Sequence, residues 1–70
     1  PSIVNQPDSL NMTALCWACE GGKTLIAEIL ISHGAEIDRP CFIDGTTALG
    51  FAARSGRHET AMTLLARGAD

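Results

Sequence analysis

The sequence predicts an all-α fold, a solenoid of stacked helix-turn-helix units with a projecting hairpin loop. Segments 11–15 and 45–49 align 34 residues apart, and the similarity continues in the same register to the end of the chain. Self-similarity at a period of about 20 to 50 residues is the signature of a repeat architecture. Further identities at this spacing are Ala18/Ala52, Gly22/Gly56, Leu30/Leu64, Gly34/Gly68 and Ala35/Ala69.

The first complete unit is predicted at residues 11–43. Thr13 is placed to cap a first helix that ends near Gly21 and Gly22, and Gly34 stops a second helix. In that second helix an i, i+3, i+4 pattern predicts a buried apolar face. The residues expected on this face are Ile26, Ile29, Leu30 and Ile31, with Lys23, Glu28 and Ser32 expected to face water.

The second unit is predicted at residues 44–70 and is truncated at its end. Thr47 takes the place of Thr13, and Gly68 takes the place of Gly34. Between the units, segment 35–46 contains Arg39-Pro40 and Asp44-Gly45, whose turn chemistry predicts an extended hairpin projecting from the stack. Residues 1–10 are predicted to be the tail and hairpin of a preceding repeat. Because the chain begins with proline rather than methionine, we expect it to belong to a longer protein.

Composition and charge exclude several classes of function. Residues 1–38 carry one lysine against five acidic residues, whereas residues 39–70 carry four arginines against three acidic residues. No basic block indicates a nucleic-acid partner. No apolar run approaches the roughly 20 residues that a membrane-spanning helix needs, and no signal-peptide pattern is present.

Three cysteines, Cys16, Cys19 and Cys41, form an odd set without the spacing of a disulfide framework. This favours a reducing compartment, with the cytoplasm favoured over the nucleus. A zinc site that adds His33 to the three cysteines and redox pairing of Cys16 with Cys19 are alternatives, but small core residues at positions 16 and 19 explain the pattern more simply. We therefore predict no metal and no cofactor.

Neither a nucleotide site nor a catalytic site is predicted. Segment 21–24, Gly-Gly-Lys-Thr, is similar to the end of a phosphate-binding loop, but the glycine required five positions earlier is Trp17. This segment is better explained as a helix-helix turn. No serine or cysteine is placed with a base and an orienting acid, and His33 and His58 fall at helix ends.

The two units resemble the ankyrin-repeat family. The first matches the family pattern through Thr13-Ala14-Leu15-Cys16-Trp17-Ala18-Cys19 and Leu30-Ile31-Ser32-His33-Gly34-Ala35-Glu36. The second matches it through 44–53 and 64–70. Alanine replaces the family's proline at positions 14 and 48, and Cys16 and Gly50 replace its histidine. The hydrogen bond from threonine to histidine that tightens the first helix is therefore absent.

The resemblance implies that a partner protein binds the hairpin tips and the exposed side of the first helices. Trp17 and Phe51 occupy equivalent positions, where they either pack between repeats or anchor a partner. Phe42 and Ile43 are apolar residues in a projecting loop, which favours contact with a partner. The predicted contact residues are Leu10, Met12, Trp17, Glu20, Phe42, Ile43, Asp44, Thr46, Phe51 and Arg54.

The function predicted from the sequence is a non-catalytic protein-interaction module of an intracellular scaffold or signalling protein, flanked by further ankyrin repeats. Two alternatives remain at this point. One is a structural spacer, and the other is a substrate-selecting regulatory module attached to a catalytic domain, such as a ubiquitin ligase or kinase, outside this chain. Nucleic acid and membrane are not expected as partners.

Overall fold

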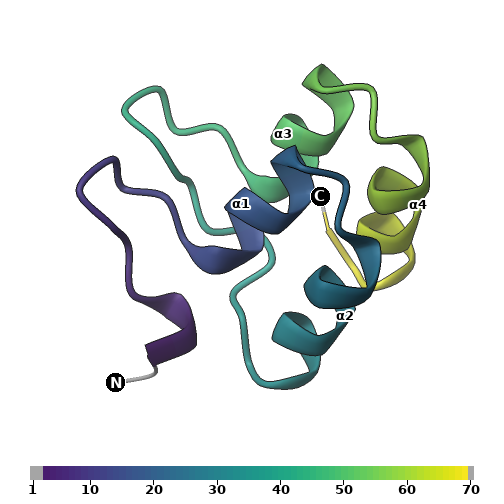
Figure 1. The fold of residues 1–70 in the computed structure, drawn as a ribbon, viewed down its shortest axis with the longest axis horizontal. Coiled ribbons are helices and arrows are strands. Elements are labelled where there is room, and N and C mark those ends of the chain that lie inside the picture. The colour runs from purple at the N-terminus through teal and green to yellow at the C-terminus, as the bar shows by residue number, and fades with distance from the viewer. Residues whose placement is uncertain (1–2, 70) are drawn as a thin grey trace.

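The computed structural model describes residues 3–69 and confirms the all-α prediction. A short 3-10 helix, η1 (Ile3–Asn5), precedes four α-helices (Figure 1). Pro1, Ser2 and Asp70, which the repeat assignment includes, lie outside the described residues. The four α-helices are α1 (Ala14–Glu20), α2 (Thr24–Ser32), α3 (Ala48–Arg54) and α4 (His58–Ala66).

The two repeats begin and stop their helices in the same way. Thr13 Oγ1 accepts a hydrogen bond of 3.4 Å from the Cys16 amide, and Thr47 Oγ1 accepts one of the same length from the Gly50 amide. These bonds satisfy an amide at each helix N-terminus that has no partner within the helix. Gly34 and Gly68, which follow the second helices, have φ angles of 96° and 98°. Such angles favour glycine, so the stop signals read from the sequence are confirmed.

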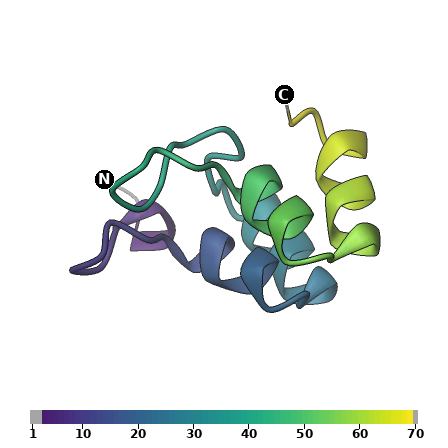
Figure 2. The same ribbon diagram turned by 90° about the horizontal axis from the view of Figure 1, so that it is seen from above.

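The helices form two layers (Figures 1 and 2). Helices α1 and α3 pack side by side, and α2 and α4 form a second layer beside them. Helix α1 also packs on α2, and α3 packs on α4, so each repeat is an antiparallel helix pair stacked on its neighbour. Small side chains line much of the shared core and permit this close approach. The buried core residues are Met12, Leu15, Cys16, Ala18, Cys19, Ala27, Cys41, Ala48, Phe51, Ala52 and Leu64.

Two loops project together from one side of the helix layers, and both views show them on the left (Figures 1 and 2). Loop 6–13 leads into α1, and loop 35–46 joins the two repeats. In the second loop the predicted hairpin is reduced to a single antiparallel bridge between Cys41 and Thr46, with N···O at 2.8 Å. The Phe42 amide donates to the Asn11 carbonyl oxygen at 2.9 Å, which ties one loop to the other.

The predicted buried face of α2 is only partly correct. Leu30 and Ile31 pack against the core, but Ile26 and Ile29 are 51% and 57% exposed. The most buried residue of α2 is instead Ala27. The sequence pattern identified apolar positions correctly, but it does not say which of them a neighbouring helix covers.

Two cysteines are paired, although their spacing predicts no disulfide framework. Cys16 of α1 and Cys41 of loop 35–46 meet as a disulfide, with their Cα atoms 7.0 Å apart. Cys19 is buried and keeps a free thiol. The pairing joins helix α1 to the loop that follows α2, so it depends on the path of the loop and not on cysteine spacing.

Candidate protein-binding surface

Residues 34 positions apart occupy equivalent places in the two repeats. The exposure of a position in one repeat can therefore be compared with that of its equivalent in the other. A position that is exposed in both repeats lies on the outer surface of the stack, whereas a position exposed in only one repeat lies where the other repeat packs. Three equivalent pairs that include predicted contact residues are exposed in both repeats, namely Ser9/Ile43, Leu10/Asp44 and Glu20/Arg54. We call the predicted contact residues among them the loop face: Leu10, Glu20, Ile43, Asp44 and Arg54.

In the second repeat, Asp44 connects the tip of loop 35–46 to Thr46 and to Arg54 of helix α3. Its Oδ1 accepts hydrogen bonds from the Thr46 hydroxyl at 2.7 Å and from the Thr46 amide at 3.0 Å. These bonds, and more weakly the charge of Arg54, lower the pKa of the Asp44 carboxyl below its ordinary value. Asp44 Oδ2 lies 3.7 Å from Arg54 Nη1, so the loop tip lies along helix α3. The exposed ion pair itself contributes little to stability.

Aromatic contacts hold the base of loop 35–46 against helix α3. The Phe42 ring meets the Phe51 ring edge to face, with centroids 6.4 Å apart, and the Arg54 guanidinium lies 5.0 Å from the Phe51 centroid. Phe42 has a φ angle of 61°, a left-handed conformation that is rare for a bulky residue. The Phe51 contact and the hydrogen bond to Asn11 hold Phe42 in this conformation.

Several predicted contact residues lie elsewhere than expected. Met12 and Phe51 are only 3% and 5% exposed, because both pack in the core between the repeats. Their side chains are therefore not available to a partner. Phe42 and Thr46 are half-buried, and each supports the loop through the contacts described above.

Trp17 is 45% exposed, but it does not belong to the loop face, because its equivalent in the second repeat is not exposed. Its equivalent, Phe51, is buried by the neighbouring repeat, so Trp17 lies on the end of the stack where a preceding repeat would pack. The Trp17 indole Nε1 donates to Asp8 Oδ2 at 2.7 Å. Asp8 is equivalent to Phe42, so in both repeats a loop residue contacts the aromatic residue of the first helix.

Both ends of the stack expose apolar side chains at positions that the other repeat covers. Ile26 is 51% exposed, while its equivalent, Thr60, is 1% exposed and shares a 2.7 Å hydroxyl hydrogen bond with Thr24 of the first repeat. At the opposite end, Leu65 is 53% exposed while its equivalent, Ile31, packs on the core. The first end presents Ala14, Trp17, Ile26 and Ile29, and the second presents Ala53, Met62 and Leu65.

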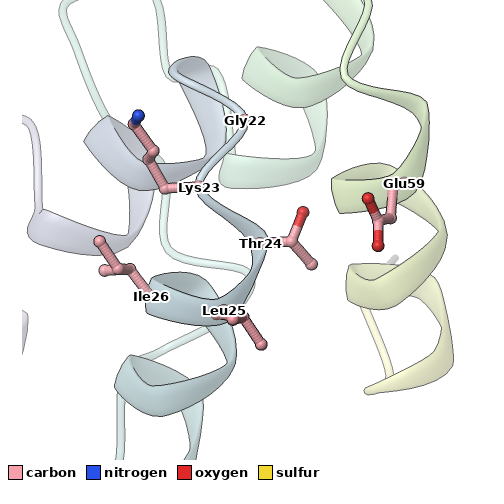
Figure 3. A pocket seen from close by; sticks show the side chains of 6 residues that line it. All are labelled: Gly22, Lys23, Thr24, Leu25, Ile26 and Glu59. Carbon is pink, nitrogen blue, oxygen red and sulfur yellow. The ribbon is translucent and has the colours of Figure 1, made fainter.

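A hollow of about 510 Å³ lies between the N-termini of α2 and α4 (Figure 3). It includes the segment that is similar to a phosphate-binding loop. Here that segment joins two helices, as expected, and Figure 3 shows the Lys23 ammonium pointing away from Glu59. The hollow is lined by Gly22, Lys23, Thr24, Leu25, Ile26 and Glu59. The apolar side chains of Leu25 and Ile26 and the carboxylate of Glu59 do not favour a phosphate there.

Residues 3–69 contain no group of three or more histidine, cysteine or acidic side chains able to hold a metal ion. The sequence alternative that combines His33 with the cysteines is not assembled, because His33 Nδ1 instead lies 2.9 Å from the Ile29 carbonyl oxygen at the end of α2. Within the same described residues, each helix is too short or too polar to cross a membrane.

Comparison with known proteins agrees with this geometry. A family profile described as ankyrin repeats in three copies matches residues 1–70, the whole chain. The chain belongs to the ankyrin-repeat family. The division of the chain at residues 10 and 43 remains a prediction from the sequence.

Segments of larger proteins are similar to this chain. Over 67 residues, or 96% of the chain, it is 36% identical to palmitoyltransferase Hip14 of Drosophila melanogaster and 37% identical to putative palmitoyltransferase ZDHHC13 of Danio rerio. It is 40% identical over the same length to BCL-6 corepressor-like protein 1 of Homo sapiens. The chain spans 10%, 10% and 4% of these relatives, so the similarity covers a small module within each of them.

Proposed function

We propose that this ankyrin-repeat chain is a protein-recognition module that binds a partner protein through the loop face. The observation that carries the proposal is the exposure of Ile43, an apolar residue at the tip of a loop tied to both repeats. Its side chain is 88% exposed, and Leu10 on the neighbouring loop is 47% exposed. Burying an isoleucine or leucine side chain at an interface gains about 1.5 to 3 kcal/mol before the costs of association.

Charged residues on the loop face favour one orientation of a partner. Glu20 and Arg54 occupy equivalent positions on α1 and α3, so the charge changes sign from one repeat to the next. A partner with an apolar centre and a matching change of sign would align with this pattern. Such complementarity contributes more to specificity and to association rate than to affinity.

Further ankyrin repeats are proposed to cover both ends of the stack. The support is the pair of apolar end surfaces, which lie at positions that the internal repeat interface buries. Repeat proteins gain stability from interfaces between neighbours, so covering Ile26 and Leu65 would stabilise this module. The small share of each relative that the chain spans agrees with a place in a longer protein.

A second proposal is that the module selects substrates for a catalytic domain outside this chain. Its support is the similarity to two palmitoyltransferases, although the corepressor relative shows that such repeats also occur in other classes of protein. Both proposals use the same surface. A scaffold or signalling role and a place in the cytoplasm remain predictions from the sequence.

The test is affinity capture from a cell lysate with the chain as bait, comparing a Leu10→Ser, Ile43→Ser variant with Leu25→Ser. Leu25 is a matched control because it is 75% exposed on α2 and lies outside the loop face. Circular dichroism first establishes that both variants keep their helices. We expect a captured protein to be lost with the double variant and retained with Leu25→Ser. Equal capture by all baits, or no specific capture, favours the spacer alternative.

A further inference from the structure

Cys16 and Cys41 connect helix α1 to loop 35–46 at a buried point. Cys16 lies on α1 of the first repeat and is 2% exposed, while Cys41 lies at the base of loop 35–46 and is fully buried. Their sulfur atoms meet as a disulfide across 25 residues of sequence. Cys41 is also held through its backbone, because its amide donates to the Thr46 carbonyl oxygen at 2.8 Å.

The surroundings of Cys41 suit both the bonded and the free sulfur. Its Sγ lies 3.5 Å from the Arg39 carbonyl oxygen and 3.7 Å from Thr13 Oγ1. A thiol donates a hydrogen bond to the Arg39 carbonyl, whereas a disulfide sulfur accepts one from the Thr13 hydroxyl. Each state therefore has a polar partner for the Cys41 sulfur within reach.

Cys19 is not expected to take part in disulfide exchange in the folded chain. It lies three positions beyond Cys16 on α1 and is fully buried. Burial raises the pKa of its thiol to about 11, so at neutral pH it stays protonated. Because the thiolate is the reactive form, exchange at Cys19 is slow while the fold is intact.

We propose that Cys16 and Cys41 form a reversible, redox-sensitive link that fastens loop 35–46 to helix α1. The oxidant is a low-molecular-weight disulfide such as oxidised glutathione. One cysteine thiolate attacks it, forms a mixed disulfide and releases one glutathione thiolate. The second cysteine thiolate then attacks the protein sulfur, which closes the Cys16–Cys41 bond and releases a second glutathione. The two cysteines are oxidised, the glutathione disulfide is reduced, and the two cysteine protons pass to the released thiolates.

Access to the buried pair comes from the loop. Segment 35–46 is built from turns with one bridge, so it opens at lower cost than the helices do. Closing the bond restricts the segment that carries Ile43 and Asp44. The inference does not depend on the proposed function, because its readouts need no partner.

The experiment equilibrates the full chain with reduced and oxidised glutathione and stops exchange with acid. Free thiols are then blocked with N-ethylmaleimide in acidic guanidinium, which exposes buried thiols, and the linkage is mapped by mass spectrometry. Chymotryptic cleavage after Trp17 separates Cys16 from Cys19, and tryptic cleavage after Lys23 separates both from Cys41. We expect Cys16–Cys41 as the dominant linkage, with Cys19 alkylated. The same chain oxidised in guanidinium provides the reference for unselective pairing. An equal distribution of linkages in buffer and in guanidinium overturns the proposal.

Two variants and a second measurement sharpen this test. Cys19→Ser should leave the link intact, whereas Cys41→Ser should abolish it without new pairing between Cys16 and Cys19. Amide hydrogen exchange then compares the oxidised and reduced chains at Cys41 and Phe42, whose amides are hydrogen-bonded in the loop. We expect exchange there to slow by about tenfold on oxidation, with little change in α4. Unchanged exchange at both amides contradicts the proposed fastening of the loop.

Discussion

The indole of Trp17 and the carboxylate of Asp8 are joined by a 2.7 Å hydrogen bond between Nε1 and Oδ2. The other carboxylate oxygen, Oδ1, accepts from the amides of Met12 at 3.0 Å and Leu10 at 2.9 Å. Asp8 thus closes loop 6–13 and connects it to helix α1. The bond from Met12, followed by that from Trp17, lowers the pKa of Asp8 below its ordinary value of 3.8.

Acid is therefore expected to release loop 6–13. A lowered pKa means that the stabilising contribution of Asp8 is present above pH 3.8 and is lost as the pH falls through the lower folded-state pKa. Trp17 is the only tryptophan, so its fluorescence reports this contact directly. We expect an emission change with its midpoint below pH 3.8. Asp8→Asn should remove this transition and Asp44→Asn should retain it, whereas a midpoint at or above 3.8 contradicts the assignment.

The cap of α3 is expected to contribute measurably to stability. Thr47→Ala removes the oxygen that accepts from the Gly50 amide, and loss of such a cap costs about 1 kcal/mol. Thr47→Ser keeps the hydroxyl and should restore most of that loss. Urea denaturation followed by circular dichroism measures the free energy of unfolding. If serine and alanine destabilise equally, the methyl group of Thr47 matters and the cap does not.

Gly50 is expected to resist replacement by alanine despite lying in a helix. A Cβ at this position would come within 2.7 Å of Thr46 Cγ2, and the Thr46 hydroxyl is held by Asp44. Gly50→Ala should therefore destabilise the chain by about 1 kcal/mol through overpacking. Thr46→Ser removes the methyl group and keeps the hydroxyl. In that background Gly50→Ala should become stabilising by up to about 1 kcal/mol. A double-mutant cycle without coupling between the two positions would sink this explanation.

Replacing the adjacent leucines Leu64 and Leu65 of α4 by alanine is expected to change the free energy of unfolding by very different amounts. Leu64 is fully buried, and Leu64→Ala should cost about 2 to 5 kcal/mol, enough to unfold much of so small a chain. Leu65 is 53% exposed, and Leu65→Ala should change stability by about 0.5 kcal/mol or less. Thermal denaturation of the two variants measures the difference. Similar losses would mean that the end of the stack near Leu65 is covered in solution.

The 34-residue spacing was sufficient to predict the helix pairs, their threonine caps and their glycine stops. Those features depend on local chemistry that recurs in each repeat, as at Thr13 and Thr47. Exposure was harder to predict, because periodicity identifies apolar positions without showing which helix covers them. Ile26 and Thr60 are equivalent in sequence, but only Thr60 has a preceding repeat packed on it.

The candidate surface was predicted in part for the same reason. Ile43 and Arg54 are exposed as expected. Phe51, predicted either to pack between repeats or to anchor a partner, is buried. The Cys16–Cys41 contact was missed because it depends on how loop 35–46 returns to α1. An odd number of cysteines gives no signal of such a pair.

Ile43 is exposed at the loop tip, whereas the residues beneath it hold the loop in place. This separation affects how binding specificity can evolve. Cys41, Phe42 and Thr46 hold the loop, while the Ile43 side chain is almost entirely in solvent. If the tip binds a partner as proposed, mutations at position 43 change what it recognises with little effect on folding. Duplicated copies of such a repeat can diverge toward new ligands one tip at a time, each retaining an unchanged framework.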